Sequence, residues 1–186
     1  LAMTGSPSHL WVWGDKKILN QKRIVAVVGT RKITPYGRSV TEDLAKSLAI
    51  RGMTVVSGLM YGVDEAAQRA ALKNRGIVIG VWAGGITRKS FGSRSRLAYE
   101  IVLNKGAVVS EFSFDKYPFK GTFPARNRIV SGLAAGVVIT EGAVKSGSLI
   151  TADCALDQGK PVGAVPGPIT SRLSDGPHAL LKTGAA

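Results

Sequence analysis

Residues 24–32 read IVAVVGTRK, five apolar residues followed by a glycine, a hydroxyl and two cations. Four of the apolar residues are β-branched, which is typical of a strand covered on both faces of a parallel sheet. Gly29 allows a sharp turn with no Cβ in the way of a ligand. The amides that follow, with Arg31 and Lys32, can converge on an anion at the start of the next helix. The stretch predicts a strand–turn–helix unit whose turn binds phosphate or only packs, since no glycine-rich nucleotide motif accompanies it.

The same rhythm of a short apolar strand and then a helix continues along the chain. Strands are expected at residues 9–13, 24–28, 53–56, 77–81, 107–110, 137–141 and 161–165, and helices at 37–50, 63–73, 97–105, 126–133, in the segment ending at 157, and at 180–182. This alternation predicts an α/β fold with a doubly wound, mainly parallel sheet and helices on both faces. Right-handed crossovers place all strand exits at one edge of the sheet, where ligands bind.

Charge sets the chain apart from an average globular protein. Lys and Arg number 25 against 12 Asp and Glu, a formal net charge of +13 in 186 residues. Such an excess indicates a polyanionic partner, most commonly nucleic acid, and the alternative is a basic surface kept for solubility. Residues 9–186 are expected to form one domain, and residues 1–8 a tag remnant or flexible N-terminus.

Several classes of site and location are disfavoured by what the sequence contains. Cys154 is the single cysteine and is expected to pack in the core, so no internal disulfide can form. Without a Cys/His cluster we expect no metal site, and no cofactor is expected. No apolar run is long enough to span a bilayer and no secretory signal is visible, so we expect a cytoplasmic protein with no membrane partner.

Residues 115–128, DKYPFKGTFPARNR, interleave four cations with three aromatic side chains. Cations that meet phosphates and rings that stack on unpaired bases are the combination used to bind single-stranded nucleic acid. Phe123 is the preferred stacking residue, and Phe119 is expected to anchor the loop to the core. The expected phosphate contacts in this loop are Lys116, Lys120, Arg126 and Arg128.

Two turns at strand exits are expected to meet at the same edge of the sheet. They are Gly29-Thr30-Arg31 and Ser146-Gly147-Ser148, the second at the start of a helix, while Ser57 and Gly58, at the exit of another strand, are further candidate contacts. Small residues at a helix start present amides and hydroxyls to an anion, so the turns would form a phosphate pocket. Residues 83–95 are expected to be a flexible basic loop, either a solvated insertion or a further part of the nucleic-acid path.

An ordered set of motifs resembles the DNA processing protein A family, also called DprA or Smf. The motifs are VAVVGTRKITPYG (25–37), VVSGLMYGVD (55–64), GTFPARNRIVSGL (121–133), SGSLITA (146–152), AVPG (164–167) and LLKTGA (180–185). Departures from the family pattern are Gln68 in place of a histidine, the basic segment 87–96 and the residues 176–178. The last two bear on the DNA path and on oligomer contacts.

The resemblance implies an extended Rossmann-like domain that binds single-stranded DNA. The family protects incoming strands during natural transformation, promotes loading of the RecA recombinase and usually acts as a homodimer without enzymatic activity. Carried over by motif, the phosphate contacts are Gly29, Thr30, Arg31 and Lys120, the stacking residue is Phe123, and Arg126, Asn127 and Arg128 are further contacts.

The alternative hypothesis is an enzyme, a nucleoside-monophosphate phosphoribohydrolase that uses the same pocket. Glu141, at a strand exit, or Asp64 would then act as general acid or base. The loop after Glu141 lacks the paired acid that such enzymes show, so the competing interpretation is that both carboxylates brace loops through hydrogen bonds.

Overall fold

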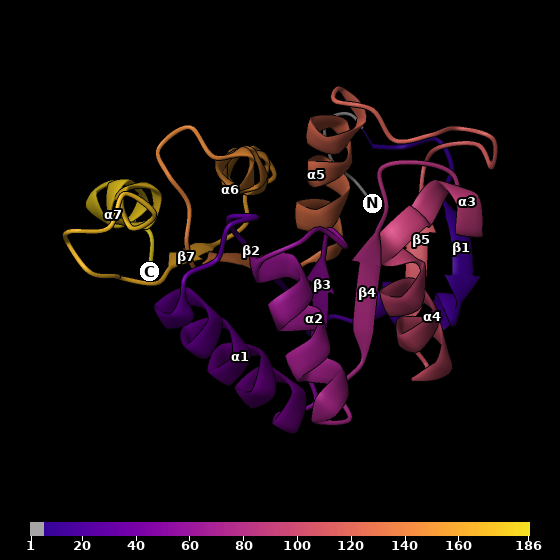
Figure 1. Cartoon of the computed structure of the whole chain (residues 1–186), viewed down its shortest axis with the longest axis horizontal. Helices are drawn as coiled ribbons and strands as arrows, with labels where there is room; N and C mark the ends of the chain where they lie inside the picture. The colour runs from indigo at the N-terminus through magenta and orange to yellow at the C-terminus, as the bar shows by residue number, and fades with distance from the viewer. Residues whose placement is uncertain (1–5) are drawn as a thin grey trace.

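The computed structural model describes residues 6–186, and these residues form an α/β fold around one mixed sheet (Figure 1). The expected tag remnant at residues 1–8 lies largely outside the described residues. The strands are β1 (Trp11–Gly14), β2 (Ile24–Val28), β3 (Thr54–Ser57), β4 (Val78–Val81), β5 (Ala107–Ser110), β6 (Gly136–Ile139) and β7 (Val162–Ala164). Their order across the sheet is β1-β5-β4-β3-β2-β6-β7, and only β1 among them runs antiparallel to its neighbour. The predicted doubly wound, mainly parallel sheet is confirmed.

Helices cover both faces of this sheet, and α7 lies at the opposite end of the molecule from β1 (Figure 1). They are α1 (Pro35–Ile50), α2 (Val63–Lys73), α3 (Arg88–Phe91), α4 (Ser95–Leu103), α5 (Thr122–Leu133), α6 (Gly147–Asp157) and α7 (Asp175–Lys182), with 3₁₀ turns η1 (Lys16–Asn20) and η2 (Gly92–Arg94). No helix within residues 6–186 is long and apolar enough to cross a bilayer.

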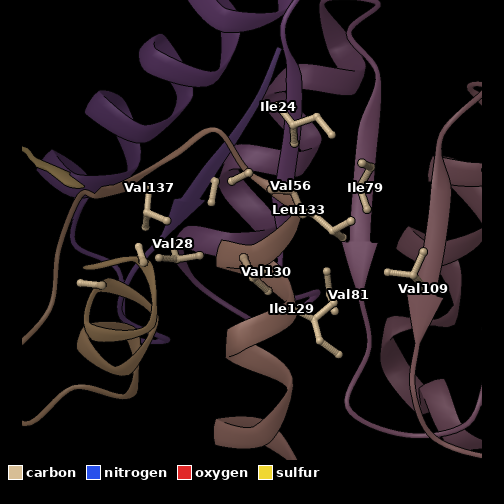
Figure 2. Close-up of a cluster of buried hydrophobic side chains, with 14 of the residues drawn as sticks. Ile24, Val28, Val56, Ile79, Val81, Val109, Ile129, Val130, Leu133 and Val137 are labelled. Carbon is tan, nitrogen blue, oxygen red and sulfur yellow. The ribbon is translucent and has the colours of Figure 1, made fainter. Parts of the chain in front are cut away.

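The core consists of two apolar layers, one on each face of the sheet. Along β2, Ile24, Ala26 and Val28 pack into one layer while Val27 packs into the other, which is the period-two alternation of a strand. Figure 2 shows the first layer, where strand side chains meet α5. The second layer is built with α1, α2 and α4. Burial on both faces explains why the strands are almost purely apolar.

The strand order reverses beside β2. Strands β3, β4 and β5 follow on one side of it, whereas β6 and β7 lie on the other. In open α/β sheets, ligands bind outside the carboxyl ends of the strands at such a switch point. The loops that leave β2 and β6 are therefore the expected place of a ligand site.

Two predicted loops turn out to be partly helical. The segment 83–95 contains α3 and η2, and it buries Ser90 and Phe91, so it is a folded insertion and the expectation of a flexible loop was wrong. Helix α5 begins at Thr122, four residues before the predicted start, because Pro124 falls in its first turn, where no helical amide partner is lost. The expectation that Cys154 packs in the core was wrong, because this side chain is only partly buried.

Candidate nucleic-acid interface

A pocket of about 650 Å³ lies at the switch point of the sheet. Its walls come from the exits of β2 and β3 and from the starts of α5 and α6. Of the predicted site residues, it is lined by Gly29, Arg31, Gly58, Lys120, Phe123, Arg126, Asn127, Ser146, Gly147 and Ser148. Thr30, Lys32, Ser57 and Arg128 do not line it. The predicted meeting of the turns Gly29-Thr30-Arg31 and Ser146-Gly147-Ser148 is what the structure shows, and Gly58 from a third strand exit lines the same pocket.

The β2 exit turn is held tightly against β6. A Cβ on Gly29 would stand 2.6 Å from both the Glu141 carbonyl oxygen and Val63 Cγ2, so the turn requires glycine. The amide of Thr30 donates to the Glu141 carbonyl at 2.7 Å, and the Thr30 hydroxyl accepts from the amide of Lys32 at 3.1 Å. Thr30 thus shapes the turn, and its amide is already engaged. Of the two cations in this turn, Arg31 lines the pocket and Lys32 does not.

Arg126 is a buried part of the pocket wall. The side chain is 3% exposed, and its Nη1 donates to the carbonyl oxygens of Gly58 and Val81. Burial lowers the pKa of Arg126 to about 10, and the nearby Asp64 carboxylate opposes that shift. Arg126 fastens the exits of β3 and β4 from within the pocket wall, and its predicted phosphate contact stays a prediction. A Cβ on residue 58 would collide with the Arg126 guanidinium, which explains why this residue is glycine.

Asp64 completes the buried charge cluster. Its Oδ2 accepts from the amide of Gly58 at 3.0 Å, and the side chain is 6% exposed. Burial raises the pKa of Asp64, while the positive charge of Arg126 and hydrogen bonds counter the shift. Ser57 is fully buried and its hydroxyl donates to the Val27 carbonyl at 2.8 Å. Ser57 therefore ties β3 to β2, and its predicted ligand contact is contradicted.

The start of α5 presents a cation and two rings. Lys120 is exposed, and the Phe123 ring is half-buried with the Arg31 guanidinium carbon 5.1 Å from its centroid. Phe119 is 54% exposed and lines the pocket, so the expectation that it anchors the loop in the core was wrong. The loop is anchored instead by Thr122, whose hydroxyl accepts from the Phe119 amide at 3.1 Å and donates to the Phe119 carbonyl at 2.8 Å.

The other two members of the Arg-Asn-Arg motif have different partners. Asn127 Nδ2 donates to the Gly147 carbonyl at 3.0 Å and so joins α5 to the start of α6. Arg128 Nη2 donates to Glu111 Oε2 at 2.5 Å, away from the pocket lining. Asn127 lines the pocket, whereas Arg128 is paired with Glu111 outside the lining, and its assignment as a ligand contact stays a prediction.

The start of α6 forms the opposite wall. Ser146 caps the helix, and its Oγ accepts from the Ser148 amide at 3.4 Å and lies 2.8 Å from Ser148 Oγ. Gly147 is exposed, and the positive end of the helix dipole is open to the pocket. Ile150 and Thr151 also line the pocket and were missed; each lies three or four residues after Ser146 or Gly147, on the same helix face.

Glu141 is occupied by α1. It is 2% exposed, and its carboxylate accepts from the Thr34 amide at 3.0 Å and the Thr34 hydroxyl at 2.6 Å. Glu141 is absent from the pocket lining, whereas Asp64 is among the lining residues although it is only 6% exposed. The interpretation that these two carboxylates brace loops is confirmed. Within residues 6–186, no group of three or more His, Cys, Asp or Glu side chains could hold a metal ion.

Comparison with known proteins places the chain among relatives of one kind. It is 44% identical to Protein Smf of Escherichia coli over 185 residues, covering 100% of this chain and 49% of that protein. It is 40% identical to the DNA processing protein DprA of Bacillus subtilis, covering 96% of this chain and 60% of that protein. The chain therefore spans about half the length of the curated relatives it matches.

Solved structures agree with the sequence comparison. DNA processing protein A from Helicobacter pylori, described for its unique single-stranded DNA binding mode, superposes with a TM-score of 0.87 at 36% identity, over 97% of this chain and 81% of that one. DprA from Streptococcus pneumoniae superposes with a TM-score of 0.85 at 38% identity, over 95% and 61% of the two chains. The family model for DNA recombination-mediator protein A matches residues 1–186. With its Rossmann-like sheet and switch-point pocket, the chain belongs to the DNA recombination-mediator protein A family.

Proposed function

We propose that this chain binds single-stranded DNA at the switch-point pocket. The observation that carries the proposal is the convergence of Arg31, Lys120 and Phe123, from two separate loops, on one pocket. Two cations and a ring at one place suit a strand whose phosphates and unpaired bases are both exposed. The H. pylori relative, described for its single-stranded DNA binding mode, supports the same ligand class for this chain.

In this proposal the phosphates meet Arg31, Lys120 and the start of α6, while a base stacks at Phe123. The Arg31 guanidinium lies near the Phe123 ring before DNA arrives, and planar guanidinium groups also stack on bases. A base that stacks on Phe123 takes the place of the Arg31 guanidinium, which then meets the adjoining phosphate. Gly29, Gly147 and Ser148 border the phosphate path, and the buried Arg126–Asp64 cluster holds the β3 exit in place.

We further propose that the protein protects incoming DNA strands and promotes RecA loading in natural transformation and recombination. The family description as a recombination mediator supports this role. The proposal places the protein in the cytoplasm and makes it a homodimer. The role is tested by following RecA filament assembly on single strands coated by a single-strand binding protein. Addition of the chain should speed assembly, and an unchanged rate would argue against RecA loading.

We infer that the pocket serves binding without catalysis. The two carboxylates nearest to it, Asp64 and Glu141, are buried and hydrogen-bonded to the backbone of neighbouring turns. A general acid or base must reach the proton that it transfers. Incubation with nucleoside monophosphates should release no free base. Steady turnover that Glu141→Gln abolishes would establish the hydrolase alternative instead.

The binding proposal is tested by reversing the two exposed cations of the pocket. The double variant Arg31→Glu, Lys120→Glu should lose at least about tenfold, or about 1.4 kcal/mol, in affinity for a labelled oligothymidine, because each reversal replaces attraction to a phosphate by repulsion. Both side chains are exposed, so the thermal midpoint should stay unchanged.

Lys46→Glu with Lys73→Glu is the matched control. Both lysines are exposed near the far ends of α1 and α2, and the change in net charge is the same. The control should lose much less affinity than the pocket variant. Equal losses would mean that only overall charge matters, and the pocket assignment would be wrong.

A further inference from the structure

A second pocket of about 790 Å³ lies beside the edge strand β1, at the end of the sheet away from α7. Aromatic side chains dominate its lining: Trp11 and Trp13 from β1, Phe91 from α3, Tyr99 from α4 and Phe114 from the loop after β5. Nothing in the binding mode proposed above uses these residues.

The rings of this second pocket are held in place yet leave their faces accessible. Trp11, Tyr99 and Phe114 are 39%, 56% and 49% exposed. Trp11 lies against Phe114 with ring centroids 4.7 Å apart, and Trp13 stacks on the buried Phe91 at 6.0 Å. Exposed rings on a fixed base offer stacking surface at little entropic cost.

The charge of the second pocket selects the kind of ligand. Arg88 and Arg96 line it and are exposed, and no acidic residue is among its lining residues. Arg96 Nε donates to Glu100 Oε1 at 3.0 Å, an exposed pair that a stronger anion can displace. Flat apolar faces beside cations fit a nucleobase and its phosphate better than a purely apolar partner.

One loop connects the two pockets. Phe114 lines the second pocket, and Pro118, Phe119 and Lys120 line the first. Five peptide units separate Phe114 from Phe119, so their Cα atoms are at most about 18 Å apart. The loop is fixed to the insertion after β4, because the amide of Gly85 donates to the Lys116 carbonyl at 2.7 Å.

Cations and exposed rings alternate along this loop. Lys116 Nζ lies 4.9 Å from the Phe119 ring centroid, and Lys89 Nζ lies 5.6 Å from the Tyr117 ring centroid. Tyr117 is 50% exposed. The surface between the pockets thus has the same chemistry as the pockets themselves, and a strand that leaves the first pocket meets it directly.

We propose that the aromatic pocket beside β1 is a second base-stacking subsite for the same DNA strand. The inference rests on the proposed function, since it extends the strand from the switch-point pocket across residues 114–120. Bases stack on Trp11, Tyr99 and Phe114, and the adjoining phosphates meet Arg88 and Arg96. Segment 87–96, where this chain departs from the family pattern, would then give it a longer DNA path.

The test compares oligothymidines of about 4 and about 16 nucleotides, which bracket the site sizes of single-strand binding folds. The variant Trp11→Ala, Tyr99→Ala, Phe114→Ala should bind the short oligonucleotide like wild type and the long one at least about tenfold more weakly. Ile50→Ala with Leu103→Ala, exposed apolar residues at the ends of α1 and α4, is the control and should bind both lengths normally. Circular dichroism and thermal midpoints verify that each variant is folded.

Intrinsic fluorescence provides a second readout that does not need the variant. The chain has three tryptophans, and Trp82 is 4% exposed with its Nε1 bonded to Ser90 Oγ at 2.9 Å. Quenching by DNA therefore reports on Trp11 and Trp13. The long oligonucleotide should quench the fluorescence and the short one should not.

The outcomes separate the two proposals. If wild type binds both lengths and the triple variant also binds both normally, the second subsite is wrong while the switch-point proposal stands. The second subsite is also wrong if the triple variant changes only self-association in sedimentation, because the pocket would then be a contact between copies of the chain. If wild type binds neither length, the proposed function fails and the subsite falls with it.

Discussion

At the scale of single residues, the Phe123 ring is expected to carry the stacking contact. Phe123→Ala should weaken binding of an oligothymidine by about 1–3 kcal/mol, or about 5- to 150-fold, because a stacked base contributes about that much. Titration by fluorescence anisotropy measures the loss. Phe119→Ala is the comparison, since Phe119 lines the same pocket and is more exposed. A loss confined to Phe119→Ala would transfer the stacking role to that ring.

Asp64 gives a prediction about pH. Burial raises its native pKa above the ordinary value of about 3.9, so only well below that pH is it protonated in both native and unfolded chains. As the pH rises, the unfolded chain ionises first, and wild type loses the stability that neutral Asp64 contributed. Asp64→Asn cannot ionise. Its free energy of unfolding, relative to wild type, should therefore increase from pH 4 towards neutrality.

The measurement for Asp64 is urea unfolding of both proteins at several pH values. Arg126 keeps its charge throughout this range, since its pKa is about 10. Loss of a hydrogen bond in the Asn variant would shift the difference by a constant, so only its trend with pH tests the prediction. A difference that stays flat, or decreases with pH, would show that the native pKa of Asp64 is not raised.

Residue roles were the part of the site least accessible to sequence reasoning. A run such as 115–128 shows which side chains are cationic or aromatic, but not which of them faces the core. Arg126 is buried because the exits of β3 and β4 leave carbonyl oxygens that need a donor, and Phe119 is exposed because Thr122 already anchors the loop. The contacts of Arg126 join segments 68 and 45 residues apart, which sequence reasoning could not foresee, whereas the Thr122–Phe119 contact is local.

At the scale of elements, the link between β6 and α1 sets the geometry of the pocket. Thr34 caps α1 through the Gly37 amide at 3.0 Å, and Glu141, just after β6, holds Thr34 in turn. Glu141→Ala would leave the partly buried hydroxyl and amide of Thr34 without their acceptor, so the free energy of unfolding should fall by about 1–3 kcal/mol. Chemical denaturation measures it.

Glu42→Ala is the control for that link. Glu42 pairs with Arg38 at 3.5 Å on the exposed face of α1, where an ion pair contributes little to stability. Each variant removes one glutamate carboxylate that contacts α1, from Glu141 in one case and from Glu42 in the other. A stability loss of equal size in both would mean that Glu141 does not brace the helix start.

Elements themselves were largely predictable, because buried parallel strands are apolar throughout and helices carry their own start signals. Residues 24–28 and 63–73 have the predicted bounds, and the parallel-sheet rules then bring the exit turns together. The insertion 83–95 was misjudged because its many small and basic residues resemble a solvated loop. Its order comes from Phe91, which packs under Trp13 and Trp82.

At the scale of the whole molecule, the net charge of +13 raises the question of how much binding is local. Binding to a single strand that neutralises about five phosphates should give a slope of log K against log salt near −3.5, at about −0.7 per phosphate. If a general basic surface holds the DNA, removing any one pair of cations should change the slope by the same small amount. The effect of a chosen pair of cations on the salt slope therefore distinguishes a defined DNA path from diffuse attraction.

The variant Arg31→Gln, Lys120→Gln measures how much of the salt slope comes from the switch-point pocket. If each side chain neutralises one phosphate, removing both should make the slope shallower by about 1.4. Lys46→Gln with Lys73→Gln removes the same charge from the far ends of α1 and α2 and should leave the slope near that of wild type. Equilibrium titrations at four salt concentrations measure all three slopes. Identical slopes for the two variants would mean that DNA is held by the total charge of the molecule, and not by the pocket where the strand order reverses.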